Sequence, residues 1–181
     1  MKPYVKALIP LFVFLALSLT FFIRLTDGKD THTLPSQLID HKFPVFSLPS
    51  LYEPEASLDN SIFEDKIVLV NVFGSWCVAC RQEHGFLQKL SNSGEIPIIG
   101  VDWRDDRDKA KAWLAKGGNP YAHIIFDHES ALIIDLGVTG APESFLVDQN
   151  GRIRYKYTGP LSVDIWERKI RPVIKHLEAG L

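Results

Sequence analysis

The chain contains only two cysteines, and Cys77 and Cys80 lie three positions apart in the stretch NVFGSWCVACRQEH. Two thiols at this spacing can form a redox couple, contribute to a metal site or attach a haem. Haem attachment needs a C-x-x-C-H motif, and Arg81 occupies the last position, which argues against it. A structural zinc site needs four ligands, and the chain has no second C-x-x-C. A three-ligand metal site with His84 stays open as an alternative, because His84 follows Cys80 by four residues.

The two cysteines lie where a predicted strand meets a predicted helix. Residues 66–74, KIVLVNVFG, form a β-branched run typical of a strand buried on both faces, and a helix is expected from about residue 78 to 91. The free N–H groups and the dipole at a helix start stabilise an anion, which lowers the pKa of a thiol placed there. We therefore expect Cys77 to be the exposed attacking thiolate and Cys80 to be the shielded resolving thiol.

The rest of the domain predicts an alternating α/β order that turns into a hairpin and a final helix. The expected elements are an irregular edge strand over 43–51, a strand over 96–103, a helix over 105–118, a strand over 123–127, a short helix over 130–138, a hairpin over 143–157 and an amphipathic helix from about Ser162 that kinks at Pro172. This order predicts an α/β, thioredoxin-like fold, with a mixed central sheet and helices on both faces.

A second motif stands directly before the predicted hairpin. In GAPES, residues 140–144, Pro142 follows Gly-Ala at the start of a strand. This arrangement indicates a constrained turn whose X-Pro bond can be cis. A plain strand-start proline explains the same pattern, and both interpretations stay open.

The N-terminal region differs in kind from the rest of the chain. Residues 7–23 carry no charge, and together with their interfacial neighbours they have the length of a membrane-spanning helix. A cleaved secretory signal is the alternative, but the only small-x-small triplet, residues 16–18, lies inside the apolar run. The predicted organisation is a cytoplasmic N-terminus at 1–6, a transmembrane anchor at 7–25, a tether at 26–37 and one domain at 38–181.

The charge pattern excludes a nucleic-acid-binding protein. The net charge is -2, the isoelectric point is about 6.3, and the Lys and Arg residues are dispersed along the chain.

The topology of the anchor places the domain outside the cytoplasm, where thiols tend to be oxidised. The chain has no spare cysteines, so its fold cannot depend on a second disulfide.

Several motifs together resemble a known family. The WCVAC sequence at 76–80 with Gly-Ala-Pro142 ahead of a hairpin resembles the thioredoxin superfamily. The resemblance narrows to the cytochrome c biogenesis thiol:disulfide interchange proteins of the CcmG or DsbE type. It is carried by NVFGSWCVACRQEH, by GNPY at 118–121, by DLGVTGAPESFLVDQNGRIRYKYTGPL and by the N-terminal anchor.

The resemblance implies a single-pass protein of the bacterial inner membrane with its domain in the periplasm. Cys77 and Cys80 are then the catalytic residues, they form the redox-active disulfide Cys77–Cys80, and Trp76 covers the site. The family reduces the disulfide of apocytochrome c, or of a maturation partner, before haem attachment, with electrons from a transmembrane thiol reductant of the DsbD type. The cis-proline loop of the family lies opposite the cysteines and receives the substrate peptide. The implied chemistry needs no metal and no cofactor.

One position departs from the cytoplasmic thioredoxins. Those proteins carry a buried Asp six residues before the first cysteine, and this chain has Asn71, whose amide cannot act as a base. Glu83, one helical turn past Cys80, and Glu143, next to Pro142, are the candidates for handling the proton. By resemblance this branch has an acidic active-site groove, which both residues fit. A solvated carboxylate is the alternative for each.

Two other functions compete with apocytochrome reduction. One is an exported thioredoxin-like reductant that serves other proteins or another thiol pathway. The other is a copper-handling or apocytochrome-holding module that binds its partners without electron transfer. The direction of electron flow rests on the resemblance alone.

Overall fold

The computed structural model describes residues 3–26 and 38–180 of the 181-residue chain. The chain divides into two compact units, residues 1–31 and 32–181. The first contains the helix α1, Pro3–Thr26, and its large apolar side chains between Leu8 and Ile23 are exposed. In the parts of the chain that are described, no helix meets the combined length and hydropathy needed to span a membrane. The anchor predicted at 7–25 is therefore not shown, and residues 27–37 of the predicted tether lie outside the described residues.

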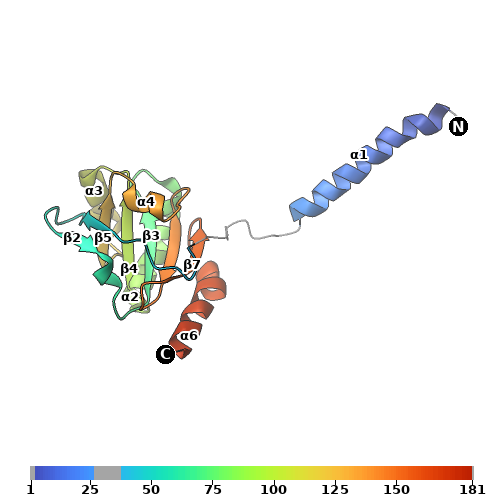
Figure 1. Ribbon diagram of the computed structural model, residues 1–181. Helices are drawn as coiled ribbons and strands as arrows, with labels where there is room; N and C mark the ends of the chain where they lie inside the picture. Colours follow the sequence, from blue (N-terminus) through green and yellow to red (C-terminus); the bar gives the residue numbers. More distant parts are fainter. Residues whose placement is uncertain (1–2, 27–37, 181) are drawn as a thin grey trace. The chain divides into compact units, whose positions relative to one another are not determined.

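The second unit is built on a five-stranded mixed sheet in the order β5-β4-β3-β6-β7 (Figure 1). Its strands are β3 Val68–Phe73, β4 Ile98–Trp103, β5 His123–Asp127, β6 Glu143–Val147 and β7 Ile153–Thr158. The β3, β4 and β5 strands run parallel, whereas β6 is antiparallel to β3 and β7 is antiparallel to β6. All six residues of the central strand β3 are buried, as its apolar run predicts. The predicted mixed sheet is confirmed.

Helices cover both faces of the sheet, as predicted. The helical segments are η1 Asn60–Phe63, α2 Val78–Ser93, α3 Arg107–Gly117, α4 Ala131–Asp135, α5 Val163–Ile165, the π-helical turn η2 Trp166–Ile170 and α6 Arg171–Ala179. The first apolar cluster joins α2, α3 and the C-terminal helical segments to one face, and we call this the cysteine face because it includes both cysteines. The second cluster joins α4 and η1 to the opposite face.

The N-terminal part of the domain differs from its prediction. The edge strand expected over residues 43–51 is only the three residues of β1, Ser47–Pro49, which pair with β2, Ser57–Asp59, in a separate two-stranded sheet. The aromatic side chains before β1 are buried against the face of the central sheet that carries α4. Burial of these side chains therefore fixes the segment more than strand pairing does.

A π-helical turn lies directly before Pro172, where a kink was predicted. The helical segment begins near Ser162 as expected, and the Ser162 hydroxyl caps it by accepting the N–H of Ile165. In the turn η2 the N–H of Arg171 donates to the carbonyl of Trp166, five residues earlier. Proline has no N–H and its ring crowds the carbonyl of the preceding turn, which accounts for a π-helical turn directly before it.

Candidate active site

The two cysteines form a disulfide at the first turn of α2, with 5.3 Å between their Cα atoms. Cys77 is the N-cap residue of the helix, and its Sγ accepts the N–H of Cys80 at 3.1 Å. This N–H and the helix dipole stabilise negative charge on Sγ once the disulfide is reduced. The predicted position of Cys77, at the junction between strand and helix, is confirmed.

The exposure of the two sulfur-bearing residues differs from the prediction. Cys77 is 4% exposed and Cys80 is 2% exposed, so the first cysteine is almost as buried as the second. The expectation of an exposed Cys77 is therefore wrong for the disulfide form. Its neighbours Trp76 and Val78 are 48% and 69% exposed. The surface around the disulfide is thus formed by the flanking side chains rather than by the sulfur atoms.

The loop that contains Pro142 lies directly beside the first cysteine. The bond between Ala141 and Pro142 is cis, which confirms the constrained turn. The carbonyl oxygen of Ala141 lies 3.5 Å from the Sγ of Cys77. A reduced Cys77 can donate its S–H to this carbonyl, so the loop contacts the sulfur that would react.

The loop before Cys77 is fixed by Trp76. The indole Nε1 of Trp76 donates to the main-chain carbonyl of Trp103 at 3.0 Å, and the two indole rings meet edge to face at 5.7 Å. A Cβ atom at Gly74 would lie 2.5 Å from the same Nε1. Position 74 must therefore be glycine for Trp76 to fold back over the end of β3.

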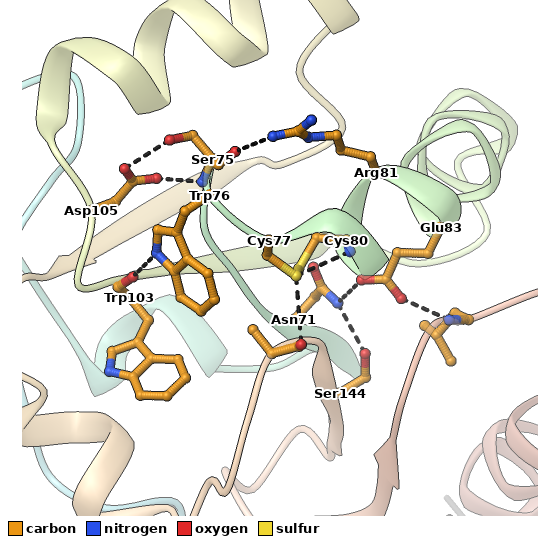
Figure 2. Close-up of a disulfide and its surroundings, with 12 residues drawn as sticks. Asn71, Ser75, Trp76, Cys77, Cys80, Arg81, Glu83, Trp103, Asp105 and Ser144 are labelled. Carbon is orange, nitrogen blue, oxygen red and sulfur yellow. Dashed lines mark hydrogen bonds between the residues drawn. A yellow bond between two sulfur atoms is a disulfide. The ribbon is translucent and has the colours of Figure 1, made fainter.

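Glu83 is buried on the cysteine face and is not a solvated carboxylate. It is 1% exposed, and its Oε1 accepts the side-chain amide of Asn71 at 2.9 Å. Its Oε2 accepts the main-chain N–H of Leu161 at 2.7 Å, and Figure 2 shows both bonds. The hydroxyl of Tyr121 donates to Oδ1 of Asn71 at 2.9 Å, which turns the Asn71 amide towards Glu83. Because Asn71 occupies the thioredoxin Asp position, the structure brings a carboxylate to that place from α2 instead.

Burial raises the pKa of Glu83 to about 7. The hydrogen bonds from the Leu161 N–H and the Asn71 amide act in the opposite direction, because they stabilise the ionised form. Both donors are neutral groups, so they offset only part of the cost of removing the charge from water. Glu83 therefore changes its protonation state near neutral pH.

Glu143 is also buried, but it lies on the opposite face of the sheet. It pairs with Val72 across to β3, and Val72 belongs to the apolar cluster beneath α4. The Glu143 carboxylate accepts the N–H and hydroxyl of Thr139 at 3.0 and 2.8 Å and forms an ion pair with Lys156 at 2.8 Å. The structure does not bring Glu143 together with the cysteines. The carboxylate instead fixes the loop over residues 139–142 through its two hydrogen bonds from Thr139.

His84 contacts α3 rather than completing a sulfur-ligand site. Its Nε2 lies 3.0 Å from the carbonyl oxygen of Gly118 and 3.2 Å from that of Gly117, and its ring packs on Trp113 at 4.5 Å between centroids. Among the described residues, no three side chains of the types that ligate metals are gathered into a possible site.

Two further carboxylates near the cysteine loop were missed by the sequence reasoning. Asp105 accepts both the N–H and the hydroxyl of Ser75, the latter at 2.8 Å, and Asp102 is fully buried at the end of β4. A signal for Asp105 existed, because charged residues follow the predicted strand 96–103, and Asp102 is the one charged residue within that strand. The carboxyl ends of parallel strands meet at one edge of a sheet, and Cys77 follows the neighbouring strand.

Comparison with known proteins supports the chemistry of the site. The chain matches the redoxin family over residues 39–171. It is 41% identical over 175 residues to the thiol:disulfide interchange protein DsbE of Allochromatium vinosum, covering 97% of this chain and 96% of that one. It is 44% identical over 170 residues to the protein of the same name from Escherichia coli, covering 92% and 91% of the two chains.

Solved structures show the same fold at lower identity. A secreted thiol-disulfide isomerase of Corynebacterium glutamicum matches with a TM-score of 0.63 and 24% identity, over 73% of this chain and 85% of that one. A DsbF homologue of Corynebacterium diphtheriae matches with a TM-score of 0.66 and 22% identity, over 83% and 95%. The expected resemblance is confirmed: the chain belongs to the redoxin family and is a thiol:disulfide oxidoreductase, similar over nearly its whole length to the DsbE thiol:disulfide interchange proteins.

Proposed function

We propose that this oxidoreductase works as a reductant in the periplasm. It reduces the disulfide of an apocytochrome c C-x-x-C-H segment, or of a maturation partner, so that haem can be attached to free thiols. A transmembrane thiol reductant of the DsbD type then returns Cys77 and Cys80 to their dithiol form. The observation that carries the proposal is the contact between Sγ of Cys77 and the Ala141 carbonyl, beside Pro142.

This contact gives a substrate disulfide a defined approach. Exposed Trp76 and Val78 form an apolar surface on either side of Cys77, and the Ala141–Pro142 backbone lies opposite. A peptide bound along that backbone would present its sulfur to Cys77, and alignment of the reacting atoms lowers the entropic part of the barrier.

The reaction consists of two thiol–disulfide exchanges. The Cys77 thiolate attacks one substrate sulfur, a bond forms between them, and the other substrate sulfur leaves as a thiolate. Cys80 then loses its proton and attacks Sγ of Cys77, which closes the Cys77–Cys80 disulfide and releases the second substrate thiolate. Two electrons pass from the cysteine pair to the substrate.

Glu83 is the base that we assign to the second exchange. It lies one helical turn past Cys80, and its pKa of about 7 allows it to be ionised when it accepts a proton and neutral when it returns one. Glu143 is excluded from our assignment because its carboxylate is engaged with Lys156 on the other face of the sheet.

The membrane anchor is part of the same proposal. The uncharged run at residues 7–23, the lysines before it and the helical conformation of α1 support a single-pass anchor at 7–25 with residues 1–6 in the cytoplasm. Exposed apolar side chains along α1 favour a lipid environment over water. An anchor keeps the reductant at the membrane where its electron donor resides.

The test is to trap the substrate in cells with the Cys80→Ser variant. Without the resolving thiol, the mixed disulfide at Cys77 persists, and non-reducing gels followed by mass spectrometry identify the trapped protein. The matched control is Cys77→Ser, which cannot form this adduct. Trapping of apocytochrome c or a maturation protein is the expected result. Trapping only of unrelated exported proteins would replace this proposal with a general reductant.

A metal-handling protein gives a different result. It would form no adduct through Cys77, and purified protein would bind Cu(I) in a manner that depends on Cys77, Cys80 or His84. A holder that transfers no electrons would keep its function in the Cys77→Ala variant. The reductase loses all function in that variant.

A further inference from the structure

The loop that carries Cys77 is held by a carboxylate from outside the cysteine motif. Asp105 lies between β4 and α3, and it is 4% exposed. Its Oδ2 accepts the N–H of Ser75 and its Oδ1 accepts the Ser75 hydroxyl at 2.8 Å, as Figure 2 shows. The Asp105 carboxylate therefore fixes the backbone two residues before Cys77 with both of its oxygens.

Asp102 lies near the end of β4, three positions before Asp105, and has an unusual environment. It is 0% exposed, and no N–H or O–H donor of the described residues reaches either of its oxygens. Its register partners on the neighbouring strands are Phe73 and Phe126. Burial, and then the negative charge and hydrogen-bonding reach of Asp105, raise the pKa of Asp102 to about 8. A neutral Asp102 has one proton to share, and Asp105 is the acceptor beside it.

We propose that Asp102 and Asp105 form a proton-sharing pair that positions the Cys77 loop. Asp102 donates its proton to Asp105, and Asp105 keeps its charge for the two hydrogen bonds from Ser75. Both are positioning residues, because they act on Cys77 through Ser75 and Trp76 rather than on the substrate. Loss of the shared proton places two carboxylates side by side and weakens the hold on Ser75.

Other charged groups face the pair from the elements around it. Arg107 of α3 lowers the pKa of Asp102 in part, while its guanidinium donates to the Ser50 carbonyl and covers the Phe126 ring at 4.1 Å. Tyr121 also lies within electrostatic range of Asp102. On the side of Asp105, His128 Nδ1 lies 3.0 Å from its main-chain oxygen. Of these groups, His128 contacts the Asp105 backbone directly, so a His128 variant serves as the control in the pH experiment.

This arrangement affects the stability of the disulfide. A loop held in place keeps Sγ of Cys77 close to Cys80 and so favours ring closure over two separate thiols. A charged Asp105 near the loop also disfavours the Cys77 thiolate. Both effects make the protein a better reductant, and both weaken when Asp105 loses its charge or releases Ser75.

The first experiment follows the Ser75 amide by NMR in the oxidised, full-length, ¹⁵N-labelled chain, where the cysteines do not titrate. The wild-type amide shift should change with a midpoint near pH 8. In Asp102→Asn, which keeps a neutral side chain of the same shape, the shift should stay constant across that range. His128→Gln should retain the transition. A transition that persists in Asp102→Asn, or is absent from the wild type, overturns the proposal.

The second experiment measures the equilibrium of the cysteine pair with glutathione at pH 7. Asp105→Asn should lower the equilibrium constant for disulfide formation by about tenfold, the effect of one hydrogen bond to a charged group. Ser75→Ala should shift it in the same direction with little risk to folding. The matched control is Asp106→Asn, which makes the same charge change on the exposed adjacent residue and should leave the constant unchanged.

An unchanged constant in both Asp105→Asn and Ser75→Ala overturns the proposal. Neither experiment uses apocytochrome c, because the inference concerns the Cys77–Cys80 couple and not its substrate. Failure of the trapping experiment would therefore not affect the inference about Asp102 and Asp105. Failure of the two experiments above would likewise not affect the proposed substrate.

Discussion

A buried glutamate lies on each side of the sheet near the junction of β3 and β6, and the two residues have different roles. Glu83, on the cysteine face, accepts hydrogen bonds from two neutral donors among the described residues, Asn71 and Leu161. Glu143, on the face beneath α4, has the Lys156 ammonium at 2.8 Å. Both are almost completely buried, so exposure does not distinguish them.

The difference lies in the charge of the partner. A buried carboxylate with neutral partners keeps a high affinity for its proton, which suits a group that must bind and release one near neutral pH. A buried carboxylate that faces an ammonium stays in an ion pair, which suits a fixed structural contact. Glu83 on the cysteine face is therefore suited to proton transfer, and Glu143 on the opposite face is suited to holding the Pro142 loop.

The largest expected effect comes from breaking the ion pair. Glu143→Ala leaves the Lys156 ammonium buried without its anion, and we expect a loss of about 3–5 kcal/mol in the free energy of unfolding. Urea denaturation of the oxidised protein measures it. The double variant Glu143→Leu with Lys156→Met should recover most of the loss, because no charge is then left alone. A loss below about 1 kcal/mol in the single variant would mean that the pair does not hold this face.

The second prediction concerns the pH dependence contributed by Glu83. Its pKa is raised by folding from 4.5 to about 7, so the folded state binds the proton more tightly. The stabilisation that proton binding to Glu83 contributes is fully present below pH 4.5. As the pH rises to 7, the free energy of unfolding falls by about 3 kcal/mol because this stabilisation is lost. Glu83→Gln cannot titrate, so the stability difference between wild type and variant should shift by that amount between pH 4 and pH 8.

Unfolding curves at the two pH values measure this shift. Glu129→Gln is the matched control, since Glu129 is an exposed carboxylate. Equal pH dependence in wild type and Glu83→Gln would show that Glu83 is ionised throughout, like a partner of a cation, and the contrast between the two faces would disappear.

The smallest expected effect sharpens the role of Asn71. Asn71→Asp restores the residue of cytoplasmic thioredoxins and places a second carboxyl group about 3 Å from Glu83. Mutual repulsion should raise the upper titration midpoint of the pair above 7 by about one pH unit. A ¹³C NMR titration of the Glu83 side chain reports it, with Ser144→Ala as a control that alters the Asn71 contacts without adding charge. A midpoint that stays at 7 or falls contradicts the prediction.

Local sequence patterns predicted several elements of the fold correctly. The β-branched run of β3, the start of α2 at Val78 and the hairpin over residues 143–157 all occur where they were predicted. Each depends on neighbours a few residues apart, so periodicity and capping preference suffice to place it. The short strand β1 was placed less well, because burial of aromatic side chains beneath α4 dominates there.

The candidate site was predicted in part. The cysteine pair, the Pro142 loop and the neighbourhood of Asn71 and Glu83 followed from motifs and helix spacing. The face occupied by Glu143 did not, because strand alternation separates two faces without saying which one α2 covers. The burial of Cys77 and the contact between Asp105 and Ser75 also required packing between segments that are distant in sequence.

By itself, therefore, the sequence determined where the two thiols sit, which helix they begin and what class of reaction they perform. Only the tertiary structure decided which carboxyl groups hold protons and which hold the backbone. Glu83 meets the N–H of Leu161 across 78 positions of the chain, and Ser75 meets Asp105 across 30. The protonation of a carboxyl group depends on burial and on the charge of its neighbours, and both are properties of the folded chain rather than of any local stretch.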